Sequence, residues 1–527
     1  TTITDGGKNG HYTEARAYNT QTYGDVMVNI NKTFGDDWSL NANIGASINN
    51  IKTDELSYRG PIQENGLPNV FNVFDLDDTK KRAEKTGWHD QTQSLFASVE
   101  VGWRQMLYLT VTGRNDWASQ LANSPSSSFF YPSVGLSWVP TSTWDLGEAL
   151  SYLKIRGSIA SVGMPFPRHL TIPTYEYDAT NRVWKDKTHY PIGDLKPERT
   201  TTYEVGLDAR LWQRISLSAS WYQADTKNQT FDPSLPPSSS YTTIYLQTGH
   251  VRNTGVELSA GYDNQWRDFR WATNFTYSWN RNEIIELAAN AVNPVTGEPL
   301  NLNKLDIKGL GKAKYILKEG GTLGDLYTTS DLRFNDNGYI EVDKNGNLLL
   351  TDEGDDIYLG SVFPDHNLAW RNDFSWKGIN LGVLFTARIG GICYSATQAN
   401  MDLYGVSEAS AAARDAGGVW INGRELVDAQ KWYQAIGSQS GLPQYYTYSA
   451  TNIRLQELSL GYTLPAKWFR DKMRMTVSFV GRNLWMIYCK APFDPEAVAS
   501  TGLNYQGIDY FMMPSLRSLG FNVKFQF

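Results

Sequence analysis

The chain has 527 residues, a net charge of −7 at pH 7 and a mean hydropathy of −0.43. This length exceeds that of an ordinary single domain and indicates either a large barrel or several domains. The acidic balance and the lack of a dense Lys/Arg run exclude a typical nucleic-acid-binding protein. No run of 18 apolar residues exists, so the sequence encodes no transmembrane helix. Two cysteines, Cys393 and Cys489, are too few for a disulfide framework or a cysteine-based metal site, and leave free thiols or one bridge open.

Alternation of apolar and polar residues dominates the chain and predicts an all-β fold. Most of the alternating segments reach ten or more residues, longer than common soluble strands and long enough to cross a bilayer at a tilt. The predicted strands, about fifteen in all, cover residues 20–33, 37–51, 91–103, 105–115, 130–139, 150–162, 200–211, 214–226, 250–262, 267–281, 362–376, 378–389, 452–464, 473–485 and 515–527.

The segment from Phe269 to Asn280 shows how such a strand would face its surroundings. Successive side chains of a strand point to opposite faces. One face carries Phe269, Trp271, Phe275, Tyr277 and Trp279, and the other carries Arg270, Asn274, Thr276, Ser278 and Asn280. A transmembrane barrel turns its aromatic face to lipid and its polar face to a wet lumen, whereas a soluble sandwich does the reverse.

Connections between the predicted strands alternate between short and long. Short connections follow Phe34, Trp103, Val139, Trp212, Tyr262, Trp376 and Leu464. Long connections span residues 52–90, 116–129, 163–199, 227–249, 282–361, 390–451 and 486–514. Bacterial outer-membrane barrels combine short periplasmic turns with long extracellular loops, so this rhythm favours a transmembrane antiparallel β-barrel.

Strand parity extends this prediction to both ends of the chain. The last segment alternates Leu519, Phe521, Val523, Phe525 and Phe527 with polar residues, as a final descending barrel strand would. Counting back makes residues 1–19 part of an extracellular loop and residues 20–527 the C-terminal part of the barrel. Because bacterial barrels have even strand numbers, fifteen strands predict others upstream, and a 22-stranded barrel is the expected whole. The chain starts at Thr1 without a Met and is expected to be a mature or internal segment.

Several short stretches, in order along most of the chain, resemble the SusC/RagA family of TonB-dependent outer-membrane transporters. They are Phe130–Trp138 (F-Y-P-S-V-G-L-S-W), Leu195–Glu198 (L-K-P-E) leading to Tyr203–Asp208 (Y-E-V-G-L-D), Arg252–Leu258 (R-N-T-G-V-E-L), Tyr358–Gly360 with Pro364, Trp376–Gly378, Leu458–Pro465 (L-S-L-G-Y-T-L-P), Gly481–Leu484 and Phe493–Glu496 (F-D-P-E). The match covers the later part of such a barrel. The plug domain and the TonB-contacting segment of the family are absent from this chain.

The resemblance implies import of oligosaccharides or peptides across the bacterial outer membrane. It implies a SusD-like surface lipoprotein as partner, TonB acting through the missing N-terminal region, and outer-membrane lipid around the barrel. A dimer of transporter–lipoprotein pairs is compatible with it. The predicted lumen is lined by residues such as Asn41, Asn43, Glu100, Arg104, Glu204, Asp208, Arg210 and Glu257.

No catalytic or metal-binding pattern stands out, so neither an enzyme nor a cofactor is expected. The six His residues lack H-x-x-x-H or HExxH spacing, and no G-x-S-x-G elbow or P-loop is present. Asp343 to Asn347 begins like a calcium loop, but Leu348 and Gly354 stand where such a loop needs Gly and Glu. A hairpin turn with Asn-Gly is the favoured interpretation, as at Asn335 to Gly338.

Aromatic residues gather in the long connection 390–451, which also contains a predicted short helix from Glu425 to Ile436. Aromatic faces suit contacts with sugar rings or peptide side chains. The candidate substrate contacts are Tyr404, Trp420, Trp432, Tyr433, Tyr445 and Tyr446. The alternative to substrate contact is that these rings pack the loop on itself or against a neighbouring protein.

Three other classes of protein remain open from the sequence. A passive outer-membrane porin would show the same strands without energy coupling. A soluble β-rich carbohydrate-active enzyme would fit the Trp and Tyr content, but not the long strands and the loop rhythm. A surface adhesin would need a separately folding exterior domain, for which no linker is visible.

Overall fold

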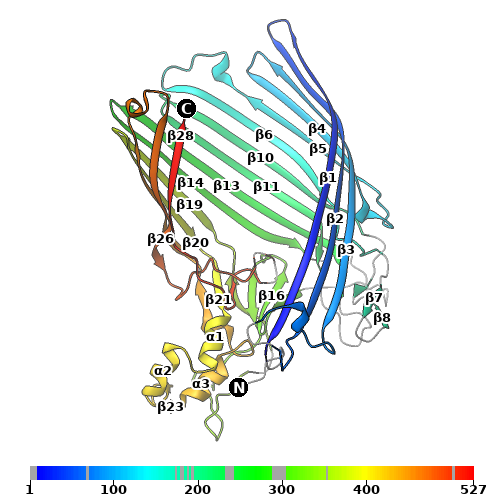
Figure 1. Cartoon of the computed structure of the whole chain (residues 1–527), viewed down its shortest axis with the longest axis vertical. Helices are drawn as coiled ribbons and strands as arrows, with labels where there is room; N and C mark the ends of the chain where they lie inside the picture. Colours follow the sequence, from blue (N-terminus) through cyan, green and yellow to red (C-terminus); the bar gives the residue numbers. More distant parts are fainter. Residues whose placement is uncertain are drawn as a thin grey trace.

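One antiparallel sheet of consecutive strands forms most of the molecule in a computed structural model (Figure 1). The structure describes residues 9–66, 70–171, 175–178, 183–186, 189–190, 195–231, 243–287, 304–351, 354–500, 502 and 505–527. Within these residues the sheet has fifteen strands, in the order β1-β2-β3-β4-β5-β6-β10-β11-β13-β14-β19-β20-β25-β26-β28. β1 and β28 are its two edges, and the strands follow one another across the sheet in chain order, with the remaining short strands inserted in the long connections.

Each strand of this sheet overlaps one segment predicted from the sequence, with shifted ends. Their bounds are β1 His11–Phe34, β2 Trp38–Pro61, β3 Arg82–Trp103, β4 Leu107–Ala118, β5 Phe129–Trp138, β6 Leu150–Met164, β10 Glu198–Leu211, β11 Ile215–Phe231, β13 Leu246–Trp266, β14 Phe269–Glu286, β19 His366–Trp376, β20 Ile379–Ile389, β25 Asn452–Thr463, β26 Arg474–Cys489 and β28 Ser518–Gln526.

The first three strands extend well past their predicted ends. Residues 11–19 continue β1 and pair with residues 53–61 of β2, and β3 begins at Arg82 rather than at residue 91. Residues 11–19 are thus strand in the structure, and the assignment of residues 1–19 to an extracellular loop stays a prediction. Both faces of this extension carry charged pairs, Arg16 with Glu14 on one face and Arg59 with Glu84 on the other. The alternation of apolar and polar residues that marks a strand is missing where both faces are polar. The ends predicted from the sequence therefore fell short of the observed ends.

The sheet has one exposed apolar face and one polar face. Ile44, Val134, Val205 and Phe521 are exposed on the apolar face although each lies inside a strand. Phe275, on the same face, is 40% exposed, and Trp271 and Trp279 are half-buried among neighbours of the same sheet. No second sheet covers these three residues in the part of the chain that the structure describes. The facing predicted for residues 269–280 is confirmed, and a soluble sandwich is excluded.

Tryptophans mark the short-turn end of the sheet. They stand at or beside the turns as Trp38, Trp103, Trp138, Trp144, Trp212, Trp266, Trp376 and Trp468, and most are exposed. The rings of Trp38 and Trp103 approach to 6.4 Å between centroids. Such a row of amphipathic rings is typical of the interfacial girdle of a membrane barrel.

Two of the long connections contain further strands and helices, gathered at the other end of the sheet (Figure 1). The first contains β15 Lys304–Leu310, β16 Ala313–Lys318, β17 Asp325–Thr328 and β18 Ile357–Ser361 in one four-stranded sheet. The second contains β21 Ile392–Ser395, α1 Ala396–Leu403, α2 Glu408–Asp415, β22 Val419–Ile421, β23 Glu425–Val427, α3 Ala429–Ile436 and β24 Thr447–Ser449. β27 Ile508–Asp509, from the last connection, pairs with β21.

Smaller elements complete the described structure. β7 Tyr175–Asp178 pairs with β8 Val183–Asp186, and β9 His189–Tyr190 pairs with β12 Thr243–Ile244. The predicted helix 425–436 is shorter than expected, because Glu425 to Val427 form β23 and Asp428 caps α3 by accepting hydrogen bonds from the Gln430 and Lys431 amides. None of the described helices has the length and apolarity needed to span a membrane.

Candidate functional site

The polar face of the sheet carries hydrogen bonds that run from strand to strand. Asn41, Glu100 and Thr110 lie side by side on β2, β3 and β4 by the register of these strands. Asn41 Nδ2 donates to Glu100 Oε1 at 3.3 Å, and Thr110 Oγ1 donates to Glu100 Oε2 at 3.2 Å. The Glu100 carboxylate is thereby held flat against the sheet.

A second network crosses β6, β10 and β11. Arg156 Nη1 lies 2.6 Å from Asp208 Oδ2, and Arg156 Nη2 lies 3.2 Å from Glu204 Oε1. Ser218 Oγ donates to Asp208 at 2.6 Å. One guanidinium therefore pairs with two carboxylates on the wall, and the side chains remain about one-third exposed.

A third network lies on β19, β25 and β26. Arg371 pairs with Asp373 at 2.8 Å and with Glu457 at 3.3 Å, and Arg482 pairs with the second oxygen of Glu457 at 3.0 Å. Paired, partly hydrated charges suit a water-filled passage, since the same groups facing lipid would cost several kcal/mol each.

The structure tests the facing of the predicted lumen residues. Asn43, Arg210 and Glu257 share the polar face with the networks above. Asn43 lies two residues from Asn41, Arg210 lies two residues from Asp208, and Glu257 lies opposite Ser220, which is two residues from Ser218. Arg104 does not belong to the wall. It lies in the β3–β4 turn with φ of 52° and pairs with Asp37 of the adjacent turn at 3.0 Å. Turn residues have no fixed face, so alternation could not assign its side chain.

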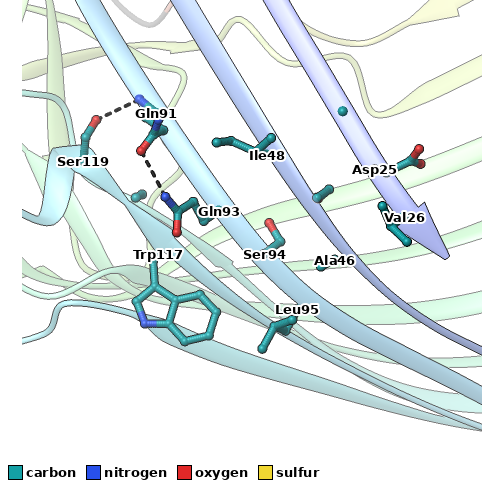
Figure 2. A pocket seen from close by; sticks show the side chains of 13 residues that line it. Asp25, Val26, Ala46, Ile48, Gln91, Gln93, Ser94, Leu95, Trp117 and Ser119 are labelled. Carbon is teal, nitrogen blue, oxygen red and sulfur yellow. Dashed lines mark hydrogen bonds between the residues drawn. The ribbon is translucent and has the colours of Figure 1, made fainter.

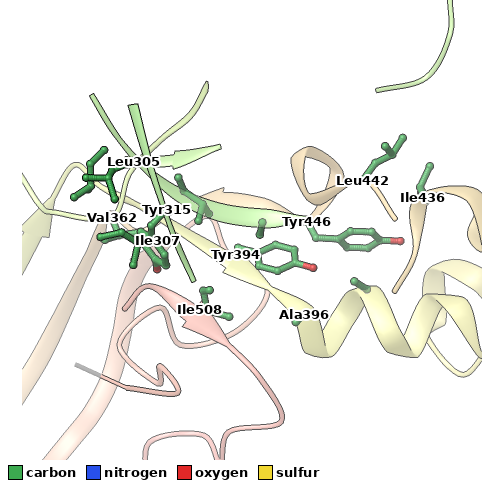
Figure 3. Packing of buried hydrophobic residues seen from close by; sticks show 14 of the residues in the cluster. Leu305, Ile307, Tyr315, Val362, Tyr394, Ala396, Ile436, Leu442, Tyr446 and Ile508 are labelled. Atoms are coloured by element: carbon green, nitrogen blue, oxygen red, sulfur yellow. The ribbon is translucent and has the colours of Figure 1, made fainter. Parts of the chain in front are cut away.

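A compact unit closes the end of the sheet opposite the tryptophan turns, and we call it the cap. It comprises residues 304–361 and 390–451 together with β27, and it has its own hydrophobic core (Figure 3). Tyr315, Tyr394, Tyr446 and Ile508 are almost completely buried in this core. Phe231, Val251 and Ile284, at the ends of barrel strands, belong to the same cluster. The cap is thus one packed body that rests on the ends of β11, β13 and β14.

The six candidate aromatic residues occupy different environments in the cap. Tyr446 is buried in the core, and burial together with nearby Asp402 raises its pKa. Trp432 and Tyr433 pack against the core, and Trp432 meets the ring of exposed Tyr445 edge-on with centroids 6.1 Å apart. Tyr404 and Trp420 are 76% and 65% exposed. Packing of the loop on itself therefore accounts for Tyr446 and Trp432, whereas the rings of Tyr404, Trp420 and Tyr445 are exposed at the surface.

Sequence reasoning missed a buried ion pair that ties the last connection to the barrel. Arg454 on β25 has a side chain only 4% exposed, and its Nη2 lies 3.0 Å from Asp494 Oδ1 and 3.4 Å from Glu496 Oε1. Burial alone would raise the pKa of Asp494, but hydrogen bonds from Arg454 and Ser515 outweigh it and hold the pKa below 3.8. The F-D-P-E motif was visible in the sequence, but its arginine partner lies 40 residues away.

The calcium-like segment forms a hairpin turn, as the sequence favoured. Asp343 Oδ1 accepts hydrogen bonds from the amides of Asn345 and Asn347, both at 2.8 Å, and Gly346 has φ of 75°. Asn335 organises a similar turn through the amides of Asn337 and Tyr339. In the described ranges no three His, Cys, Asp or Glu side chains come together as metal ligands would.

Both cysteines are free thiols, which settles the alternative left open by the sequence. Cys393 is buried in the cap, and burial raises its pKa to about 12. A buried thiol with a raised pKa is unreactive at neutral pH.

A hollow of about 1,060 Å³ lies over β1 to β4 (Figure 2). Val26, Ile48, Leu95 and Trp117 line it, and by strand register all four belong to the apolar face. Gln93 Nε2 donates to Gln91 Oε1 at 3.1 Å beside them. This hollow therefore faces away from the polar wall and is no part of a polar passage.

The molecule thus has a single-layered sheet with one apolar face, one polar face of paired charges and a cap at one end. Comparison with known proteins identifies the family that has this architecture. Residues 2–384 match the family described as TonB dependent receptor-like, beta-barrel. The chain belongs to this family. Its members are outer-membrane receptors and transporters rather than enzymes, which confirms the predicted fold class, location and lack of enzymatic activity. In this family's barrel the polar face lines the bore and the apolar face meets lipid.

Two relatives of known name are TonB-dependent receptors. The chain is 25% identical to TonB-dependent receptor P3 of Formosa agariphila over all of its length and 54% of that protein. It is 22% identical to TonB-dependent receptor SusC of Bacteroides thetaiotaomicron over 71% of this chain and 38% of that protein. The chain therefore spans about half the length, or less, of these relatives, and the resemblance to SusC and RagA is confirmed.

Solved structures support the same fold. The RagAB peptide transporter aligns with a TM-score of 0.71 at 19% identity, covering 98% of this chain and 56% of the RagAB chain. RagAB in its 'open-open' state aligns with a TM-score of 0.72 at 18% identity. The barrel wall and the cap thus have a counterpart among known transporters.

Proposed function

We propose that this chain forms the C-terminal part of the barrel of an outer-membrane importer that takes up oligosaccharides or peptides with energy from TonB. The observation that carries this proposal is a bore wall of paired charges that ends beneath a folded cap. A wall of this kind holds water and polar solutes, and the cap narrows access to it. Cargo would collect at the cap and then pass along the wall.

The proposed assembly includes a SusD-like lipoprotein seated over the cap, and TonB acting through the part of the longer relatives that this chain does not span. Among the six candidate aromatics, exposed Tyr404, Trp420 and Tyr445 are available to cargo or lipoprotein. Cargo would be trapped between the lipoprotein and the cap, then released when a plug is pulled aside. Two such pairs could join through their barrels as a dimer. We also propose that residues 1–10 and the remaining long connections lie outside the cell. The whole barrel would have 22 strands.

The names of the relatives do not decide between two classes of cargo. RagAB is named a peptide transporter, and SusC is named only a TonB-dependent receptor. Tyr and Trp faces bind both sugar rings and peptide side chains. Oligosaccharides and peptides therefore both belong to the proposal.

Uptake by cells that carry the full-length gene tests this function. Radiolabelled oligosaccharide and peptide pools are offered to a strain with the gene, a strain without it, and a strain with the gene but without TonB. The proposal predicts saturable uptake of one pool that needs both the gene and TonB. Uptake that persists without TonB would assign a passive porin instead. Accumulation at the surface without entry would assign an adhesin.

A further inference from the structure

A small cavity lies where the cap joins the barrel. Its volume is about 240 Å³, and it is bounded by the end of β20, the start of β25 and the last connection. Its walls mix apolar and polar groups, namely Val362, Arg388, Gly390, Ile392, Ala450, Asn452, Pro495, Glu496, Val498, Gln506 and Gly507.

Arg388 reaches this cavity from the polar face of the sheet. It lies next to the end of β20, opposite Asn367 of β19 and Asn452 of β25. Asn380 lies on the same face eight residues earlier, and its Nδ2 donates to Thr463 Oγ1 at 3.0 Å. Because side chains alternate along a strand, Arg388 belongs to the bore wall at its cap end.

The charge of Arg388 is unmatched, unlike that of its neighbours. Arg371, Arg454 and Arg482 on the same wall all pair with carboxylates. Half-buried Arg388 forms no hydrogen bond or ion pair with any residue in the described part of the chain. A guanidinium that loses water without gaining a partner is unfavourable, so such a group calls for an anion.

The carboxylate already in the cavity does not supply that anion. Glu496 lies 3.4 Å from Arg454, which is itself almost completely buried. Asn452 Nδ2 also donates to Glu496 at 3.4 Å. The ion pair and the hydrogen bond of Glu496 therefore go to Arg454 and Asn452, and in the described part of the chain neither goes to Arg388.

We propose that this cavity binds a carboxylate group of the cargo through Arg388. A guanidinium matches a carboxylate with two parallel hydrogen bonds, and Val362, Ile392 and Val498 would cover the apolar atoms beside it. The volume is below the ~300–1,000 Å³ of pockets that enclose a whole ligand, so only one end of a longer cargo fits. The inference rests on the proposed import function and adds an acidic group to the cargo. That group is either the C-terminus of a peptide or a uronic acid of a glycan.

Binding of short probes to the full-length protein in detergent tests the site. The probes are tri-alanine against tri-alanine amide, and glucuronate against glucose, followed by saturation-transfer NMR titration. Each pair differs in whether it carries the carboxylate. Wild-type protein should bind at least one acid and bind its neutral counterpart at least about tenfold more weakly.

Variants then assign the effect to Arg388. Arg388→Gln should weaken the preferred acid at least about tenfold and leave the neutral probe unchanged, whereas Arg388→Lys should keep part of the preference. Arg210→Gln is the matched control, since Arg210 is an unpaired arginine of the same face at the tryptophan-turn end. It should change nothing.

The outcomes separate the site from the function. Preference for tri-alanine assigns a peptide terminus, and preference for glucuronate assigns an acidic sugar. Equal binding of acids and neutral probes, or the same loss in Arg210→Gln, would overturn the carboxylate site even if uptake stays TonB-dependent. Uptake independent of TonB would overturn the import function and leave the binding result standing.

Discussion

Adjacent residues of one barrel strand face two different solvents. On β14, Phe275 lies on the exposed apolar face, while Asn274 lies on the polar face and accepts a hydrogen bond from Ser259. The choice of side chain at each position therefore follows its neighbours in space rather than its neighbours in sequence. This is why a chain with a mean hydropathy of −0.43 can span a membrane.

Phe275→Arg should destabilise the folded barrel by roughly 2–4 kcal/mol, because the charge would enter the lipid zone. Asn274→Arg should be nearly neutral, because the same charge would enter the aqueous bore. Urea titrations of full-length protein in bilayers measure both values. Similar losses in the two variants would contradict the assigned faces.

The Arg454–Asp494 pair links the last connection to β25 in a pH-dependent way. The folded-state pKa of Asp494 lies below 3.8, so its contribution to stability is complete above the unfolded-state pKa of about 3.9. It is lost as the pH falls through the lowered, folded-state value. Pepsin cleavage within residues 490–517 should therefore accelerate only below pH 3.8. The Asp494→Asn variant controls for other carboxylates, and an equally steep acceleration in it would rule out this pair as the cause.

At the scale of elements, the cap is a hydrophobic unit built from segments far apart in sequence. Tyr394 is fully buried in it, and its hydroxyl has no hydrogen-bond partner in the described structure. The ring contributes apolar contacts, while the hydroxyl contributes only the cost of losing water.

Tyr394→Phe should leave the cap as stable as before or slightly more stable, because it removes only the unpaired hydroxyl. Tyr394→Ala should cost about 3–5 kcal/mol, the range for deleting a buried aromatic ring. Hydrogen exchange in residues 304–361 and 390–451 reports the stability of the cap separately from that of the barrel. A marked loss in the Phe variant would show that the hydroxyl is bonded after all.

The two kinds of element differ in how far the sequence predicts them. Barrel strands were predictable because each has one face in lipid, which imposes a strict period of two over ten residues. The extension of β1 to β3 carries charges on both faces, so apolar and polar residues do not alternate there. Cap strands of two to seven residues offer too short a pattern, and their core unites Leu305, Tyr394 and Ile508.

The candidate aromatics were recognisable by type, but only tertiary packing separates buried Tyr446 from exposed Trp420. Neither Arg388 nor Arg454 carries a local motif, since their roles depend on which charges lie nearby.

At the scale of the whole molecule, short turns with tryptophans lie at one end of the sheet and the cap lies at the other (Figure 1). Family membership places this sheet in the outer membrane. Short turns of such barrels face the periplasm, and we propose the same orientation here, with the cap on the outside. This polarity gives the proposed import its direction, from the cap toward the tryptophan turns. The proposed import requires that the apolar face of the sheet meets lipid.

Spin labels on β6 test that dependence most directly. Ile159 lies opposite Val134 and Tyr203 on the apolar face, and Ser158 lies opposite Gly135 and Glu204 on the polar face. Each is replaced by Cys in full-length protein that lacks Cys393 and Cys489, then labelled and reconstituted in bilayers. We predict that a label at position 159 collides mainly with lipid-soluble oxygen and one at 158 with a water-soluble nickel chelate. The reverse pattern, or equal access at both positions, would contradict the account.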